Sequence, residues 1–71
     1  MNYLQESILR KLCEGPATLP QIWGEGASEA QKQKTLDATH ELVKRDLIDR
    51  IDNGGAWFHY AITNKGRKAM Q

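Results

Sequence analysis

The change of hydrophobic period within one uninterrupted stretch constrains the fold most. Neither proline nor glycine occurs from Ser28 to Asn53. Over the first part of this stretch, apolar side chains recur every three or four residues, as they do on one face of a helix. From Ile48 onward the pattern changes to the alternation that is typical of strands. A long helix that leads almost directly into a strand is therefore predicted.

That strand begins a predicted β-hairpin. The runs 48–52 and 56–62 flank Asn53-Gly54-Gly55. Asn-Gly between two such runs is typical of hairpin turns, because both residues tolerate a positive φ. Alternation along the second run places three side chains on an inward face: Phe58, Tyr60 and Ile62. The opposite face carries Trp57, which we expect either to be half-buried under the helix ends or to anchor a protein partner.

Three N-terminal capping patterns predict three helices before the hairpin. Asn2, Thr18 and Ser28 are each followed three residues later by glutamine, as in a capping box. The first helix is expected over about residues 3–14, before Gly15 and Pro16. The second is short and follows Thr18, and a short strand near Ala17 can precede it. The third starts at Ser28.

A last helical piece is expected from Asn64 to about Met70. Thr63 can cap it, and Gly66 weakens it. Periodic placement in these elements predicts one shared core: Leu4, Ile8, Leu12, Ile22, Leu36, Leu42, Leu47, Tyr60 and Ile62. Cys13 is expected to be a small core residue beside it.

Length and composition favour one domain over residues 1–71. Hydrophobic residues make up 39% and charged residues 27%, which is ordinary for a soluble chain. No apolar run suggests a membrane span, and the N-terminus lacks the features of a secretory signal. The single cysteine excludes an internal disulfide and favours the cytoplasm. A core this small, without disulfide or metal, favours a homodimer, through Tyr3 on the first helix and the C-terminal segment.

Charge is unevenly distributed along the chain. The net charge is only +1, which by itself does not indicate nucleic-acid binding. Residues 1–52 hold seven Lys/Arg and nine Asp/Glu, whereas residues 53–71 hold Lys65, Arg67 and Lys68 with no acid. The basic C-terminal segment is either a solvated helix or a patch that contacts phosphates.

Two segments resemble a known fold family. Residues 42–50 (LVKRDLIDR) resemble the end of the recognition helix in winged helix-turn-helix regulators of the MarR, PadR and ArsR kinds. Residues 60–67 (YAITNKGR) resemble the segment that leaves their wing. The resemblance implies an α+β winged helix-turn-helix with a three-helix core, a β-hairpin wing and a short C-terminal helix. The chain departs from the pattern at Asp46, where glycine is common, and in lacking long dimerisation helices.

The resemblance also implies duplex DNA binding, with the third helix in the major groove. Glutamine can pair with adenine, lysine with guanine, and the threonine methyl can touch thymine. The candidate residues on that helix are Ser28, Gln31, Lys32, Gln33, Lys34, Thr35 and Ala38. Arg50 at the wing can reach a phosphate or the minor groove, and the C-terminal candidates for phosphate contacts are Lys65, Arg67 and Lys68. The alternative is an ordinary solvated helix face.

The same residues also fit other functions. Asp37 and Glu41 on the third helix oppose phosphate binding, and they favour a protein-interaction module, such as an adaptor or inhibitor, as the alternative function. Trp57 supports the same alternative, and RNA binding is a third. No metal-binding or phosphate-loop motif occurs, and the only histidines are His40 and His59. We therefore expect neither an enzyme nor a cofactor.

Overall fold

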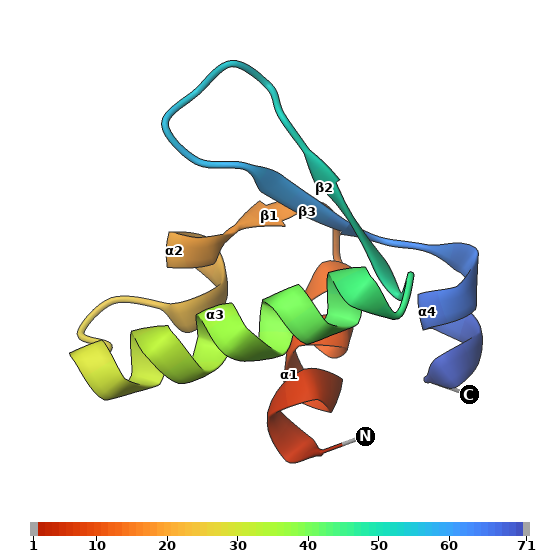
Figure 1. Cartoon of the computed structure of the whole chain (residues 1–71), viewed down its shortest axis with the longest axis horizontal. Coiled ribbons are helices and arrows are strands. Elements are labelled where there is room, and N and C mark those ends of the chain that lie inside the picture. The colour runs from red at the N-terminus through yellow and green to blue at the C-terminus, as the bar shows by residue number, and fades with distance from the viewer. Residues whose placement is uncertain (1, 71) are drawn as a thin grey trace.

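The helices and strands of the computed structural model, which describes residues 2–70, form a helical layer beneath a small sheet. In chain order they are α1 (Tyr3–Leu12), β1 (Ala17–Thr18), α2 (Leu19–Trp23), α3 (Glu29–Lys44), β2 (Ile48–Ile51), β3 (His59–Ile62) and α4 (Asn64–Ala69). The sheet is antiparallel in the order β1-β3-β2. The hairpin of β2 and β3 projects beyond the helices as a wing (Figure 1). This is the predicted winged helix-turn-helix, including the short strand near Ala17.

Side-chain caps fix where the helices begin. Ser28 Oγ accepts the N–H of Gln31 at 3.1 Å, and Gln31 Oε1 accepts the N–H of Ser28 at 2.8 Å, which completes the predicted capping box. Gln21 Oε1 accepts the N–H of Thr18 at 2.9 Å at the start of α2. Two more cap residues accept a backbone N–H three residues further on: Asn2 and Thr63. These bonds satisfy donors that a helix leaves unpaired at its first turn.

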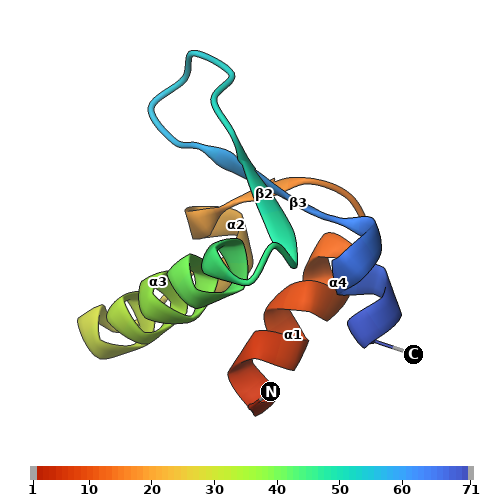
Figure 2. The same cartoon turned by 45° about the vertical axis from the view of Figure 1, so that its right-hand side comes forward.

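The core lies where α1 and α3 meet the underside of the sheet (Figure 2). Five of the nine predicted core residues are buried: Ile8, Leu12, Leu42, Leu47 and Tyr60. The other four are partly buried and pack against them: Leu4, Ile22, Leu36 and Ile62. The core also contains five buried residues outside the predicted set: Leu9, Ala17, Leu19, Ala38 and Ile48. Both β1 and the start of β2 therefore contribute to it.

Cys13 is exposed, so its prediction as a core residue is wrong. The helix ends at Leu12, and Cys13 is its C-cap. At 100° per residue, Cys13 lies roughly a quarter turn off the centre of the buried stripe that includes Ile8 and Leu12. No further turn of helix follows to cover it.

The wing is longer than a tight hairpin turn. Residues 52–58 connect β2 to β3, so Asn53-Gly54 does not form a two-residue turn. Of this pair only Gly54 has a positive φ, +80°, and its N–H donates to Asp52 Oδ1 at 2.9 Å. Phe58 precedes the strand and is 41% exposed, so its predicted inward orientation is wrong. Within β3 only Tyr60 is buried, and its three neighbours in the strand are partly buried.

A left-handed residue ends α3 and directs the chain into β2. The N–H of Leu47 donates to the carbonyl of Leu42 and that of Asp46 to the carbonyl of Val43, both at 3.0 Å. These two bonds form a Schellman motif around Asp46, whose φ is +63°. The sequence places an aspartate at the position where such a motif usually has glycine.

We expect Asp46→Gly to stabilise the protein. A left-handed conformation costs a residue with a Cβ about 1–2 kcal/mol, although aspartate tolerates it better than most. Glycine removes that cost but gains more entropy in the unfolded chain. The net gain should be about 0.5–1 kcal/mol in the free energy of unfolding, measured by urea denaturation. Asp49→Gly, within β2, is the control and should destabilise; a loss of stability in Asp46→Gly would contradict this account.

Candidate nucleic-acid interface

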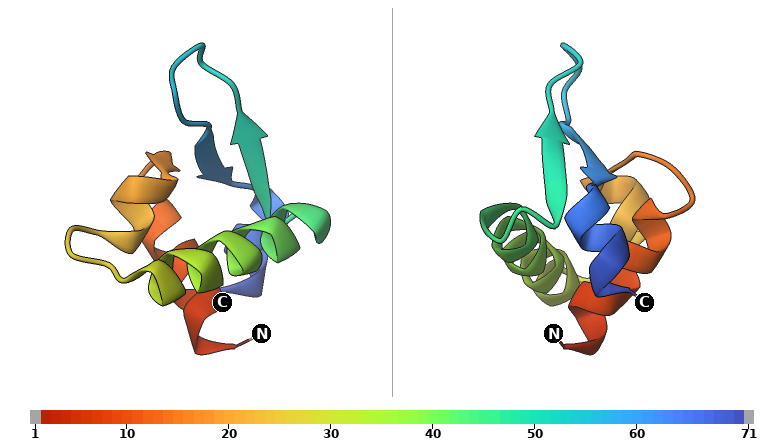
Figure 3. Two further views of the ribbon diagram at one scale, coloured as in Figure 1. Left: turned by 60° about the vertical axis from the view of Figure 1, so that its left-hand side comes forward. Right: turned by 90° about the vertical axis from the view of Figure 1, so that its right-hand side faces the viewer.

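The outward face of α3 is not covered by the rest of the described chain (Figure 3). Four residues of its inner face are buried against the core: Thr35, Ala38, Thr39 and Leu42. Four side chains on the opposite side are exposed: Gln33, Asp37, His40 and Lys44. Lys34 is exposed at the flank of α3, where it borders a hollow with Ile22 and Trp23 of α2. A long helix with one face buried and the other open, beside a projecting wing, has the shape that fits a DNA groove.

Two predicted base-contacting residues lie on the buried side instead. Thr35 is 5% exposed and Ala38 is 6% exposed. Both fall on the stripe that also holds Thr39 and Leu42, because residues three and four apart share one helix face. The side chains of Thr35 and Ala38 therefore pack in the core and are not part of the exposed surface of α3.

The remaining predicted residues of α3 are accessible to different degrees. Ser28 and Gln31 use their side-chain oxygens in the capping box, although the amide nitrogen of Gln31 stays free of that pair. Gln33 Nε2 donates to Asp37 Oδ1 at 3.0 Å. Lys34 is exposed and forms no ion pair within residues 2–70. Lys34 is thus the least engaged cation in the first half of α3.

Lys32 contacts both an acidic side chain and an aromatic ring. Its ammonium lies 3.5 Å from a carboxylate oxygen of Glu29 and 5.6 Å from the ring centroid of Trp23. Trp23 meets Trp57 of the wing edge to face, with centroids 5.8 Å apart. These residues border a hollow of about 360 Å³ whose floor includes Leu36. Trp57 is 47% exposed and contacts α2 through Trp23, so both alternatives for it, a half-buried wing residue and an anchor for a protein partner, stay open.

Two of the three acidic side chains of α3 form ion pairs, and the third accepts a hydrogen bond from a neutral amide. Glu29 pairs with Lys32 and Asp37 accepts from Gln33. Arg45 Nε donates to Glu41 Oε1 at 3.0 Å. Exposed ion pairs contribute little to stability, but each places a cation beside an acid that would otherwise repel phosphate. The neutral Gln33 amide leaves the negative charge of Asp37 in place. Two lysines of α3 remain without such a partner within residues 2–70: Lys34 and Lys44.

A second hollow lies between the C-terminal half of α3 and the wing. It has a volume of about 320 Å³ and is lined by His40, Val43, Lys44, Arg50 and Tyr60, with no acid among them. Burial raises the pKa of Tyr60 above its usual 10, and the nearby positive charge of Arg50 acts in the opposite direction. Sequence reasoning identified Arg50 but missed His40 and Lys44. Their four-residue spacing on one helix face was the available indication.

The basic residues of α4 lie elsewhere. Lys65, Arg67 and Lys68 are exposed. However, α4 follows β3 at the end of α3 opposite to Ser28 (Figures 1 and 2). Arg67 and Lys68 occupy the last turn of α4, where cations stabilise a helix end. The structure does not bring these residues together with the first turns of α3.

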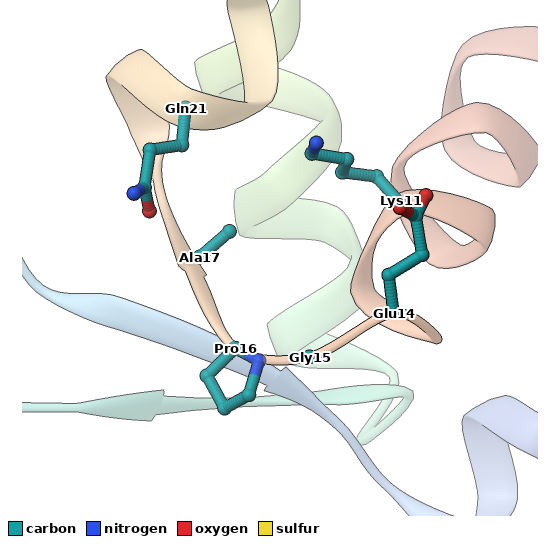
Figure 4. Close-up of a pocket in the computed structure, with 6 residues that line it drawn as sticks. All are labelled: Lys11, Glu14, Gly15, Pro16, Ala17 and Gln21. Atoms are coloured by element: carbon teal, nitrogen blue, oxygen red, sulfur yellow. The ribbon is translucent and has the colours of Figure 1, made fainter.

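A third hollow lies apart from this surface. Lys11, Glu14, Gly15, Pro16, Ala17 and Gln21 line it where α1 leads into β1 and α2 (Figure 4). No residue of α3 or of the wing borders it. Within the described residues, no group of three or more His, Cys, Asp or Glu is placed to hold a metal ion. None of the helices over residues 2–70 has the length and apolarity to cross a membrane.

Comparison with solved structures finds the same architecture elsewhere. A structure of RosR from H. salinarum, grown from NaBr, superposes with a TM-score of 0.77 at 25% identity. A complex structure of hsRosR-S1 superposes with a TM-score of 0.78 at 22% identity. The fold is a winged helix-turn-helix. Each comparison covers 99% of this chain, and 67% and 66% of the respective RosR chains.

Sequence comparison adds no family assignment. No family model matches the chain, and no curated protein matches it. The RosR structures and this chain therefore share the winged helix architecture, which includes α3 and the wing. Because a fold alone does not determine function, the function has to be inferred from the residues of α3 and the wing.

Proposed function

We propose that this protein is a small transcription regulator that binds duplex DNA with α3 in the major groove. Its fold is similar to that of RosR, a winged helix-turn-helix. The main support is that two exposed lysines of α3, Lys34 and Lys44, have no acidic partner within residues 2–70, whereas Glu29 and Glu41 form ion pairs with other cations. Counterion release at unpaired cations is what drives binding to the phosphate backbone.

The residues of α3 fit different kinds of contact. Gln33 can exchange its bond with Asp37 for paired hydrogen bonds to adenine. Lys34 can reach a phosphate or a guanine, and it lies near the positive end of the α3 dipole. Lys32 can contribute only if DNA competes with Glu29 and Trp23 for its ammonium. The exposed cations of α4 would contact phosphates only where the DNA extends past the end of α3.

We further propose that the protein acts as a homodimer in the cytoplasm. A two-fold dimer would present two α3 helices to successive turns of the major groove. Tyr3 on α1 is 80% exposed, which leaves this aromatic side chain available to a second copy.

Within winged helix proteins, residues 42–50 and 60–67 favour the MarR, PadR and ArsR kinds.

A protein-interaction module is the second candidate. Three large apolar side chains of the wing are exposed: Ile51 (37%), Trp57 (47%) and Phe58 (41%). Exposed aromatic residues are over-represented at the centres of protein interfaces. The wing tip also carries Asp52 and neither lysine nor arginine. If the protein does not bind DNA, a function as a protein-interaction module is favoured.

Reversal of charge at Lys34 tests the DNA-binding face. We expect Lys34→Glu to weaken binding to every duplex sequence and to lower the salt slope by about one, because a phosphate contact is not sequence-selective. Gln33→Ala should act differently, with a cost of about 1–3 kcal/mol confined to a preferred sequence. Fluorescence anisotropy at several salt concentrations measures both effects.

The matched control for Lys34→Glu is Lys11→Glu. Lys11 is an exposed lysine on α1, in the hollow that no α3 or wing residue borders. The two variants have the same net charge, so a difference between them reports position rather than total charge. Equal loss of affinity in both variants would contradict the assignment of α3 as the binding face.

A further inference from the structure

We propose that His40, Lys44 and Arg50 together bind one backbone phosphate of duplex DNA in the hollow between α3 and the wing. The proposal rests on the DNA-binding function above and adds a site to it. It names two residues that were not among the sequence-based candidates, His40 and Lys44. It also gives the wing a role that its tip, without lysine or arginine, does not supply.

The helix contributes two of the three groups. His40 and Lys44 are one turn apart on α3, both are exposed, and both border the hollow together with Val43. Lys44 makes no ion pair within the described part of the chain. The neighbouring acid Glu41 is bonded to Arg45 instead. An imidazole donates from at least one ring nitrogen in either protonation state, so His40 can donate alongside the Lys44 ammonium.

The wing contributes Arg50, which packs against an aromatic ring. Arg50 lies on β2, opposite Tyr60 of β3. Its guanidinium carbon is 4.7 Å from the ring centroid of Phe58. A guanidinium that packs against an aromatic ring keeps its N–H groups available for an oxyanion. Phe58 is therefore a positioning residue for Arg50, which gives a physical reason for its exposure on the wing.

The hollow suits a single phosphate in composition and place. Its volume is about 320 Å³, it is lined from both α3 and the wing, and no acid borders it. DNA strands flank a helix that enters the major groove, and the hollow between α3 and the wing offers a place for a phosphate of one of these strands. A guanidinium that can donate two parallel bonds and an ammonium acting as a point charge are complementary donors for one phosphate.

The salt dependence of DNA binding tests whether the two cations share one phosphate. Each neutralised phosphate contributes about 0.9 to the slope of log affinity against log salt. For the double variant Lys44→Gln/Arg50→Gln we expect the slope to fall by about 0.9, with roughly a tenfold or greater loss of affinity at low salt. The charge-retaining variant Lys44→Arg should keep the wild-type slope. The probe is a labelled random-sequence duplex, and thermal melts show that each variant is folded.

The outcomes separate this inference from the proposed function. Lys11→Gln is the matched control and should leave the slope unchanged. Lys11 is exposed, and the hollow that it borders includes no residue of α3 or of the wing. A fall of about 1.8 in the double variant would mean two separate phosphates and would overturn the shared site, as would an unchanged slope. Absence of binding by the wild type would overturn the proposed function and this inference together. Wild-type binding with an unaltered double variant would overturn the inference alone.

Discussion

Truncation of Leu42 to alanine should leave much of the protein unfolded at ordinary temperatures. Leu42 has no exposed surface, and it lies at the centre of the core that α1, α3 and the sheet share. Removal of a buried leucine side chain to alanine costs about 2–5 kcal/mol, which includes the cavity that it leaves. Small domains have net stabilities near the lower end of about 5–15 kcal/mol, so this loss consumes most of the margin.

Urea denaturation followed by circular dichroism measures this loss. Leu36→Ala is the matched control, because it makes the same chemical change on the same helix at a partly buried position. We expect Leu36→Ala to cost clearly less than Leu42→Ala. A Leu42→Ala variant with the midpoint of the wild type would refute the described core.

Alanine at Gly66 is expected to destabilise the protein, although alanine is the better helix former. Gly66 is buried at the start of α4, where a Cβ would overlap the carbonyl oxygen of Leu47 and lie 2.8 Å from Cγ1 of Ile62. The carbonyl belongs to the backbone between α3 and β2, so it cannot move without disturbing both elements. Overpacking of this kind costs about 1–3 kcal/mol or more, against a gain of about 1 kcal/mol in helix propensity.

Gly55→Ala provides the control for Gly66→Ala. A Cβ at Gly55 would meet nothing within 4 Å, and Gly55 does not have a positive φ. We expect its free energy of unfolding to stay within about 0.5 kcal/mol of the wild type, as at other open surface positions. If Gly66→Ala were as stable as Gly55→Ala, the packing of α4 against the α3–β2 connection would be wrong.

Local rules of sequence were sufficient for most of the fold. The polar caps Asn2, Thr18, Ser28 and Thr63 mark helix starts that depend on neighbours three residues away. The change of period after Ile48 marks the transition to a strand. The same rules could not give the length of the wing loop, because Asn53-Gly54 permits a tight turn but does not require one. The sequence pattern therefore predicts a strand that includes Phe58, whereas β3 begins one residue later, at His59.

The candidate site was less accessible to sequence reasoning, because it depends on which side of α3 faces the core. The first turns carry a row of polar residues, and sequence alone did not separate buried Thr35 from exposed Lys34. The cations that border the hollow between α3 and the wing come from α3 and β2. His40 and Lys44 become candidates for DNA contacts only because the structure places them beside Arg50. The presence of glycine at position 66 has a reason that no local rule contains, namely the close approach of the Leu47 carbonyl, which leaves no space for a Cβ.

Binding of the wild-type protein to a labelled random-sequence duplex, followed by fluorescence anisotropy across a series of salt concentrations, tests the central claim most directly. The claim is that the uncovered face of α3 and the wing bind DNA through unpaired cations. It predicts measurable affinity at low salt, with log affinity falling linearly as log salt rises, at about 0.9 per phosphate contacted. No binding at low salt, or binding whose strength does not depend on salt, would contradict it.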